Sequence, residues 1–298
     1  MIYIIILNYN GQKDLRECLD SIFKQLKYLS YKVVVVDNAS TDGSVAMIKN
    51  KFPQVKLIKN KKNLGFAEGN NVGIRYALKQ KADYILILNN DTIVHRDFLT
   101  ELVKTANALK ADLIGPKINF YQPSNLVWAA GGKVNIFLGQ TKHLFGEKDE
   151  RDVPFYPFAV DYLPFAAALI KRKVFQRIGL LDPDYFLLFE DTDFCYRAKK
   201  AGFKIMVAPS SKIWHKVSQS FNGIYSPTYL YYLVRNRGLF LRKNAPRYVW
   251  FVFIWVYLAF IFKKLIILWL KNKPQKKLAS LAIIKGFWDF LWNKKGAR

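Results

Sequence analysis

Cysteine is nearly absent from this 298-residue chain, which contains only Cys18 and Cys195. The two lie far apart in segments that look helical and partly apolar, so the sequence supplies neither a disulfide framework nor a cysteine-based metal cluster. This cysteine usage fits a reducing compartment. The first residues, Met1 to Leu7, include no basic residue and run directly into strand-like sequence, so we expect no signal peptide.

Acidic residues are scarce as well: 22 Asp and Glu stand against 47 Lys and Arg, which gives a formal net charge of +25. The excess is greatest from Arg235 to Arg298, where 15 basic residues accompany one acid, Asp289. Such a charge predicts an anionic partner, which is nucleic acid, an acidic substrate or an anionic membrane. Because the same region is rich in apolar and aromatic residues, we expect an anionic membrane surface and no nucleic acid.

Hydrophobic residues make up 51% of the chain, enough for the core of one large α/β domain with an appendage, or of two modest domains. In the first half, apolar runs alternate with helix-like segments, as in a doubly wound sheet with right-handed crossovers. The predicted strands are Ile2–Leu7, Val33–Val36, Val55–Ile58, Tyr84–Leu88 and Leu113–Ile118. The predicted helices are Leu15–Leu26, Ser44–Lys51, Phe66–Lys79, Phe98–Leu109 and, later in the chain, Glu190–Lys200 before Gly202. The segment from Phe120 to Pro157 is typical of long loops and edge strands.

The last part of the chain is strongly apolar and basic. Tyr248–Phe262 is a run of 15 apolar residues, followed by two lysines and a second run, Leu265–Leu270. Fifteen residues are short for a membrane span, which needs about 20. Leu281–Trp292 combines apolar and aromatic residues with lysines, as in a helix that lies in the membrane interface. We therefore favour interfacial or re-entrant attachment over a spanning helix or a buried core helix.

One carboxylate follows the predicted strand Tyr84–Leu88, in the sequence Asn89-Asn90-Asp91-Thr92. Open α/β folds bind their ligands beyond the carboxyl ends of the strands. A carboxylate at this edge can hold Mg²⁺ or Mn²⁺ while substrate phosphates complete the coordination shell. The alternative is an aspartate that caps the next helix.

A second strand-end carboxylate, Asp37, precedes Asn38. It is placed to accept a hydrogen bond from the N3–H of a uracil or thymine ring, whereas helix capping explains Asp42 better. The polar loop of residues 63–71 enters a helix, and small residues at a helix start suit close approach to a nucleotide or its phosphates. An ordinary turn has a similar composition.

Acidic residues also open the predicted helix Glu190–Lys200, in the sequence Glu190-Asp191-Thr192-Asp193. The helix dipole favours acids in a first turn, which is the structural explanation. The functional explanation requires one carboxylate that faces a cleft and accepts a proton from an attacking hydroxyl. His215 follows a strand-like segment and could return to the same sheet edge as Asp91, although a lone histidine is more often structural.

In this order, the segments resemble the inverting family 2 glycosyltransferases with the GT-A fold, especially their rhamnosyltransferase-like branch. The resemblance covers about residues 1–245 and rests on Ile6–Asn10, Val36–Ser44, Asn63–Gly73, Leu88–Thr92, Phe189–Gly202 and His215. It implies an α/β fold with a doubly wound mixed sheet flanked by helices. Its nucleotide-binding half would be residues 1–118 and its acceptor and catalytic half residues 119–245, with membrane-associating helices over 246–298.

The resemblance also implies roles for single residues. Enzymes of this family bind a nucleoside diphosphate sugar. By resemblance, Asp91 and His215 would hold a divalent cation, Mg²⁺ or Mn²⁺, that bridges the diphosphate, and Asp191 would be the catalytic base with Glu190 beside it. The residues implied in nucleotide binding are Tyr9, Asn10, Asp37, Asn38, Gly65, Phe66, Asn70 and Asn90.

The implied activity is transfer of a sugar, with inversion, to a hydroxyl of a lipid-linked or cell-surface glycan at the cytoplasmic face of the cell membrane. The favoured donor is dTDP-rhamnose. The alternatives are a UDP-sugar such as UDP-galactose or UDP-GlcNAc, and a non-catalytic relative that binds nucleotide sugar or glycan. Two positions depart from the family pattern. Asn89 replaces a frequent first aspartate, and Phe165 stands in a stretch where relatives often have a glycine, which changes the expected pocket shape.

Overall fold

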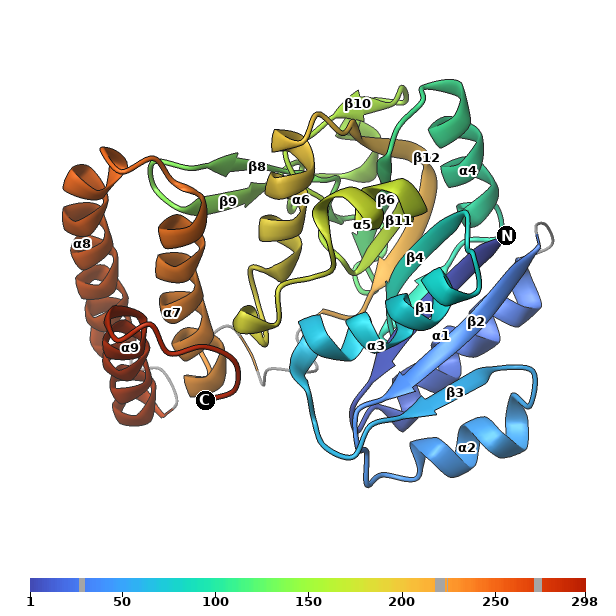
Figure 1. Cartoon of the computed structure of the whole chain (residues 1–298), viewed down its shortest axis with the longest axis horizontal. Coiled ribbons are helices and arrows are strands. Elements are labelled where there is room, and N and C mark those ends of the chain that lie inside the picture. Colours follow the sequence, from blue (N-terminus) through green and yellow to red (C-terminus); the bar gives the residue numbers. More distant parts are fainter. Residues whose placement is uncertain (27–29, 218–222, 224, 271–274) are drawn as a thin grey trace.

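The computed structural model describes residues 1–26, 30–217, 223, 225–270 and 275–298. A large sheet with helices on both faces forms most of the molecule, and three C-terminal helices lie together to one side of it (Figure 1). The strands are β1 (Ile2–Asn8), β2 (Tyr31–Asp37), β3 (Lys56–Lys59), β4 (Tyr84–Asn89), β5 (Thr92–Val94), β6 (Leu113–Phe120), β7 (Val127–Ala129), β8 (Gly132–Asn135), β9 (Gln140–His143), β10 (Phe158–Ala159), β11 (Ala167–Lys171) and β12 (Ile205–His215). The helices are α1 (Gln12–Gln25), α2 (Ser44–Lys51), α3 (Gly65–Lys79), α4 (Phe98–Ala108), α5 (Arg172–Ile178), α6 (Glu190–Lys200), α7 (Pro227–Asn244), α8 (Val249–Leu270) and α9 (Lys276–Leu291). Two short 3₁₀ turns are η1 (Glu150–Asp152) and η2 (Pro183–Tyr185).

The sheet is mixed, as expected from the resemblance. Its strand order is β10-β12-β6-β11-β4-β1-β2-β3, with β5 paired to β12 and β7 paired to β6. Strands β1, β2, β3 and β4 are parallel neighbours, whereas β11 runs antiparallel between β4 and β6. Strands β8 and β9 form a separate hairpin. The expected strand and helix alternation is therefore present, with an antiparallel strand in the middle of the sheet.

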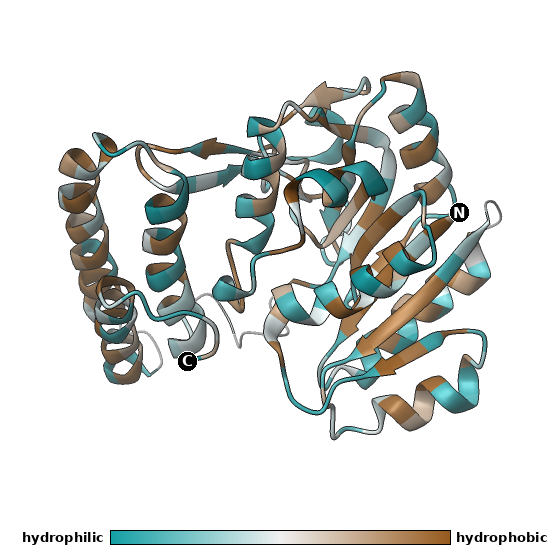
Figure 2. Cartoon of the chain, in the orientation of Figure 1, coloured by the Kyte–Doolittle hydropathy of each residue, from teal (hydrophilic) through white to brown (hydrophobic). Residues whose placement is uncertain are grey.

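Alternate residues of the central strands enter two separate cores, because successive side chains of a strand point to opposite faces. From β1, Ile4 and Ile6 pack with apolar residues of α1, α2 and α4 on one face. Tyr3 and Ile5 pack with residues of α3, α5 and α6 on the other face. Burial on both faces explains why these strands read as continuous apolar runs in the sequence. Figure 2 shows the same strands as hydrophobic along their length.

The strand register places polar residues at one edge of the sheet. Asn8 at the end of β1 lies opposite Asp37 at the end of β2, and Leu7 lies opposite Asn89 at the end of β4. Strand β12 pairs with both β5 and β6, which sets His215 opposite Thr92. The residues that the sequence suggested for ligand binding therefore approach the same edge from different strands.

The main difference between the observed and the predicted elements is that some observed strands and helices were not predicted from the sequence. Strands β5 and β11 and helix α7 were not predicted, while most predicted elements have ends within one to three residues of the observed ones. The two apolar runs of the C-terminal region form one helix, α8, which continues through Lys263 and Lys264. Lysine lowers hydropathy but is a good helix former, so it interrupts the apolar pattern and not the backbone.

Helices α7, α8 and α9 share a third core, which also includes Tyr185 and Phe189 from the loop before α6. Helix α8 contributes one buried stripe that includes Phe253 and Tyr257, while most of its other side chains are exposed. It is therefore not a buried core helix. Among the described residues, it is the one helix long and apolar enough to cross a membrane by length and composition alone.

The close packing of α3 on the sheet predicts a stability effect at Gly73. A Cβ atom there would lie 2.5 Å from Ile5 Cγ2 and 3.0 Å from Val36 Cγ2, both on stiff β-branched side chains. Overpacking costs about 1–3 kcal/mol, and a contact of 2.5 Å with a stiff side chain places this site in the upper part of that range, at about 2–3 kcal/mol. The gain in helix propensity returns about 1 kcal/mol, so Gly73→Ala should lower the free energy of unfolding by about 1–2 kcal/mol. Urea denaturation measures this, with the exposed Lys79→Ala on the same helix as control. A Gly73→Ala protein as stable as the wild type would contradict the packing.

Candidate active site

Asn8 connects the three central strand ends. Its side chain is fully buried, and its Nδ2 lies 3.3 Å from Asp37 Oδ1 and 3.1 Å from Ser40 Oγ. Its Oδ1 accepts a hydrogen bond of 2.9 Å from Asn90 Nδ2. Asn8 belongs to the motif behind the resemblance but had no predicted role. The structure assigns it the task of holding Asp37 and Asn90, both expected to bind the nucleotide, in fixed positions.

Asp37 is buried, with 2% of its surface exposed, and its Oδ2 accepts a hydrogen bond of 3.0 Å from the Ser40 amide. Contact with a base would therefore use the remaining lone pairs of the carboxylate. Tyr9, which is 51% exposed, lies just beyond the end of β1 and is free to stack on a planar ring. Asn10 is held in the left-handed region, and its Oδ1 accepts a 2.8 Å hydrogen bond from the Thr41 amide.

Asn38 organises the loop that leads into α3. Its Oδ1 accepts from the Leu64 amide, and its Nδ2 donates to Asn63 Oδ1 and to the Gly65 carbonyl. At Gly65 the backbone φ is +78°, and a Cβ would lie 2.4 Å from the Phe186 carbonyl oxygen, so only glycine fits.

The start of α3 is less open to phosphates than the sequence suggested. The Gly65 amide already donates to Asn63 Oδ1, and the Phe66 amide donates to the Phe186 carbonyl at 2.6 Å. Further along, Asn70 donates to the Phe66 carbonyl, while its buried Oδ1 has no hydrogen-bond partner among the described residues. A nucleotide would therefore meet side chains of this loop more readily than its first amides.

Asp91 and His215 lie together, as the sequence suggested. His215 Nε2 is 3.1 Å from Asp91 Oδ1, and both side chains are buried. The Lys216 amide also donates to the Asp91 carbonyl at 3.0 Å, which ties the end of β12 to the β4–β5 connection. Burial by itself raises the pKa of Asp91, but the charge and hydrogen bond of His215 outweigh it and lower that pKa. Asp91 is therefore ionised at neutral pH.

The donor set at this corner fits a divalent cation. Asp91 Oδ1 is buried and lacks a well-aligned hydrogen bond within the described residues. His215 Nε2 lies 3.1 Å from it, a separation at which both atoms can bind one cation. In the same residues, no group of three or more His, Cys, Asp or Glu side chains comes close enough to form a cage. Two ligands from the described part of the chain are sufficient, because Mg²⁺ in particular is commonly bound by one or two carboxylates together with substrate phosphates and water.

Asp91 and His215 face the same cavity as Glu190 and Asp191. This cavity has a volume of about 380 Å³. Its other lining is mainly apolar and aromatic, and it includes Phe66, Trp128, His143, Tyr162, Phe165, Leu188 and Tyr229. Trp128 packs edge-on against both His143 and His215, with ring centroids 4.6 and 4.7 Å apart. Trp128 and His143 come from residues 120–157, the segment expected to form long loops and edge strands over the site, and neither had a predicted role.

The three acids at the start of α6 have different surroundings. Asp193 is held by Tyr185 Oη, Asn244 Nδ2 and Arg197 Nε, the last at 2.7 Å, so it has a structural role. Asp191 Oδ1 accepts from the amide and hydroxyl of Thr192, at 2.6 and 3.1 Å, and the Phe165 amide also donates to the Asp191 carboxylate. Glu190 Oε2 is buried without a partner in the described part of the chain. These side-chain contacts account for Asp193 and leave Glu190 and Asp191 available.

Burial raises the pKa of both Glu190 and Asp191, and the charge of Asp191 raises that of Glu190 further. The hydrogen bonds from Thr192 favour the charged form of Asp191. The pair therefore keeps a proton to higher pH than exposed carboxylates do. A buried carboxylate with a raised pKa is a suitable proton acceptor near neutral pH.

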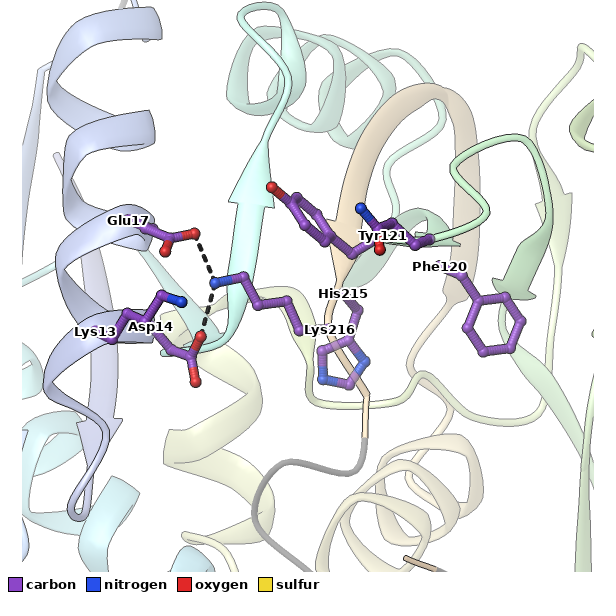
Figure 3. Close-up of a pocket in the computed structure, with 8 residues that line it drawn as sticks. Lys13, Asp14, Glu17, Phe120, Tyr121, His215 and Lys216 are labelled. Atoms are coloured by element: carbon purple, nitrogen blue, oxygen red, sulfur yellow. Dashed lines mark hydrogen bonds and ion pairs between the residues drawn. The ribbon is translucent and has the colours of Figure 1, made fainter.

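A second cavity, of about 480 Å³, lies next to His215 (Figure 3). In it, Lys216 Nζ lies 2.7 Å from both Asp14 and Glu17 of α1. Burial lowers the pKa of Lys216, but the hydrogen bonds that Lys216 donates to these two carboxylates outweigh it and raise that pKa. The positive charge of Lys216 is therefore balanced by these two carboxylates. Lys216 helps to fix the position of the adjacent His215 and is not available to bind a phosphate.

Comparison with known proteins identifies the class of this fold and site. The mannosyltransferase PcManGT from Pyrobaculum calidifontis, solved with GDP-Man and Mn²⁺, superposes with a TM-score of 0.62 at 16% identity, over 99% of this chain and 88% of that one. The fold is therefore that of the GT-A glycosyltransferases.

The family follows from the sequence comparisons. Residues 3–179 match the model of glycosyl transferase family 2, and the chain belongs to this family. It is 29% identical to the dTDP-rhamnosyl transferase RfbF of Shigella flexneri over 260 residues, which cover 82% of this chain and 80% of RfbF. It is 24% identical to the N-acetylglucosaminyl-diphospho-decaprenol L-rhamnosyltransferase of Mycobacterium tuberculosis over 215 residues, 63% of this chain and 67% of that protein. The chain thus falls in the rhamnosyltransferase-like branch.

Proposed function

We propose that this protein transfers rhamnose from dTDP-rhamnose, with inversion, to a hydroxyl of a lipid-linked or cell-surface glycan. The observation that carries the proposal is the shared cavity, in which the Asp91–His215 pair faces the Glu190–Asp191 pair. The first pair suits a cation and the diphosphate of a sugar nucleotide, and the second suits proton transfer from an acceptor. The names of the two relatives support the donor sugar and a lipid-linked acceptor. A UDP-sugar is the alternative donor.

In the proposed reaction, Asp191 accepts the proton of the acceptor hydroxyl as that oxygen attacks the anomeric carbon. Attack from the face opposite the leaving diphosphate gives inversion in one displacement, so no covalent intermediate on the protein is required. Glu190, when it carries a proton, would donate a hydrogen bond to the acceptor or the sugar. The apolar walls formed by Phe165 and Leu188 limit access of water, which would compete with the acceptor.

A divalent cation, Mg²⁺ or Mn²⁺, would be held by Asp91 and His215 and would stabilise negative charge on the leaving diphosphate when bound. Asp91 contributes the ionised carboxylate because its pKa is lowered. Lys216, anchored by two carboxylates of α1, keeps the adjacent His215 in position. The network around Asn8 would hold Asp37 and Asn90 for the nucleotide in the same way.

We also propose attachment to an anionic membrane at its cytoplasmic face through α8 and α9, by interfacial contact. Both helices expose large apolar side chains, and basic residues precede and follow them. The exposed apolar side chains include Phe251, Trp255, Phe262 and Trp269 on α8 and Leu281, Trp288 and Trp292 on or next to α9. An apolar surface bordered by lysines and arginines is typical of helices at a headgroup interface. This placement would bring a lipid-linked acceptor to the catalytic domain.

The proposed base predicts a specific loss in Asp191→Asn. Asparagine keeps the shape but cannot accept the proton, so transfer from dTDP-rhamnose to a polyprenyl-diphosphate-linked N-acetylglucosamine should fall by about 10²–10⁴-fold. Stabilisation by dTDP in a thermal-shift assay should remain. In the wild type, activity should rise with pH across a range above the ordinary aspartate pKa of about 3.9, because a raised pKa keeps the base protonated to higher pH.

The control for this substitution is Asp20→Asn, on the partly exposed face of α1 far from the cavity in sequence and packing. It should transfer at the wild-type rate. Wild-type activity in Asp191→Asn would exclude Asp191 as the base. A wild-type protein that binds dTDP-rhamnose but transfers to no glycan acceptor would favour the non-catalytic alternative.

The membrane proposal predicts that the double substitution Trp255→Ser and Trp269→Ser weakens binding to phosphatidylglycerol-containing vesicles, measured by sedimentation, by about tenfold or more. The reason is that each tryptophan side chain buried in the membrane interface should contribute more than about 1 kcal/mol to binding. The matched control is Phe155→Ser, which removes a highly exposed aromatic residue from the catalytic half. Equal sedimentation of the double variant and the wild type would contradict attachment through α8.

A further inference from the structure

The loop between η2 and α6 has an unusual backbone. Phe186, Leu188 and Phe189 all have positive φ angles, of 47°, 68° and 76°. Non-glycine residues seldom adopt this region, and the strained conformation persists only where the surroundings fix it. The loop ends at Glu190, directly before the proposed base. Three such residues in four positions therefore require an external support.

Asn236 of α7 supplies part of this support. The side chain is fully buried, and its Nδ2 lies 2.8, 2.7 and 2.9 Å from the carbonyl oxygens of Tyr185, Leu187 and Leu188. Its Oδ1 in turn accepts a 2.9 Å hydrogen bond from Arg235 Nε, which fixes the orientation of the amide. One side chain thus contacts three carbonyls of the strained loop.

Arg235 supplies the rest. Its guanidinium is buried, and Nη2 donates to the Asp184 carbonyl at 3.1 Å while Nη1 donates to the Gly296 carbonyl at 2.6 Å. The guanidinium also lies over the ring of Tyr232, 4.9 Å from its centroid, and Tyr232 stacks on Phe186 with centroids 5.4 Å apart. Arg235 therefore joins α7, the loop and the segment that follows α9.

The supported loop contacts both halves of the proposed site. The Phe186 carbonyl accepts from the Phe66 amide at the start of α3, where the nucleotide is expected. Leu187, Leu188 and Phe189 line the cavity, and Glu190 and Asp191 follow at once. A shift of the loop would move the base relative to the donor without removing any residue that contacts substrate.

We infer that Arg235 and Asn236 are positioning residues that act through residues 184–189 to hold Asp191 in the geometry needed for transfer. The inference rests on the proposed role of Asp191. It explains why two buried positions of α7 carry polar residues, although apolar residues would be sufficient for packing. It also gives the Gly296 contact a function, because the same arginine links the C-terminal segment to the catalytic loop.

The test compares full-length Asn236→Asp with the wild type in the transfer assay described above. Aspartate has the same shape, but it places a carboxylate oxygen against three carbonyl oxygens. Since misplacement by about 1 Å can cost about 100-fold, we expect kcat to fall by about that factor while the KM for dTDP-rhamnose changes by less than about threefold. Arg235→Lys, which keeps the charge but not the planar fork, is the milder second variant and should lower kcat by about tenfold.

The matched control is Tyr257→Phe, which removes a buried hydrogen bond from α8 to the Val234 carbonyl of α7 and leaves the hydrogen bonds of residues 184–189 in place. It should lower the melting temperature but leave kcat unchanged. If the control loses as much kcat as both α7 variants, Arg235 and Asn236 only stabilise the fold, and the inference is overturned. So would wild-type kcat in Arg235→Lys and Asn236→Asp.

The Asp191→Asn result separates this inference from the proposed function. If Asp191→Asn loses transfer while both α7 variants keep the wild-type kcat, only the positioning role is wrong. If Asp191→Asn transfers normally, both the base and the residues said to position it are wrong.

Discussion

The parallel pairing of β1 with β2 and β4 is the constraint on which the candidate site depends. Its register aligns Asn8, Asp37 and Asn89 at one edge, and the buried amide of Asn8 then joins the β2 end to the β4 end. A slip of one residue would turn every side chain to the opposite face and disperse this group. The two apolar cores prevent such a slip, because alternate residues of β1 are fixed in each of them.

The polar residues around the cavity form two groups. One group lines the cavity and keeps unengaged hydrogen-bonding atoms, and the other group holds the first in position. Asp91, His215, Glu190 and Asp191 line the cavity, and Asp91 Oδ1, His215 Nδ1 and Glu190 Oε2 have no hydrogen-bond partner in the described residues. Asn8, Lys216 and Asn236 have their hydrogen-bonding groups engaged with protein. This division separates residues expected to meet substrate from residues that position them, and it distinguishes Asp191 from Asp193 in the same helix turn.

Much of this arrangement could be predicted from the sequence, because apolar strands that end in polar residues indicate both the sheet and its ligand-binding edge. The proximity of His215 to Asp91 was predicted and is observed, whereas the roles of the site residues stay predictions. The support from α7 could not be predicted. Arg235 contributed to the basic excess that suggested a membrane, yet its charge is buried against backbone carbonyls. Net charge reports the number of basic residues and not their partners. The antiparallel strand β11 was missed because its short apolar run has no distinctive period.

The most direct test of the central claim is calorimetric titration of the wild type and of Asp91→Asn with dTDP-rhamnose, with Mn²⁺ and with EDTA. If Asp91 and His215 hold a cation against the diphosphate, Mn²⁺ should tighten binding to the wild type by about tenfold or more, equivalent to about 1.4 kcal/mol, and should have no such effect on Asp91→Asn. Equal affinities with Mn²⁺ and EDTA in both proteins would contradict the account.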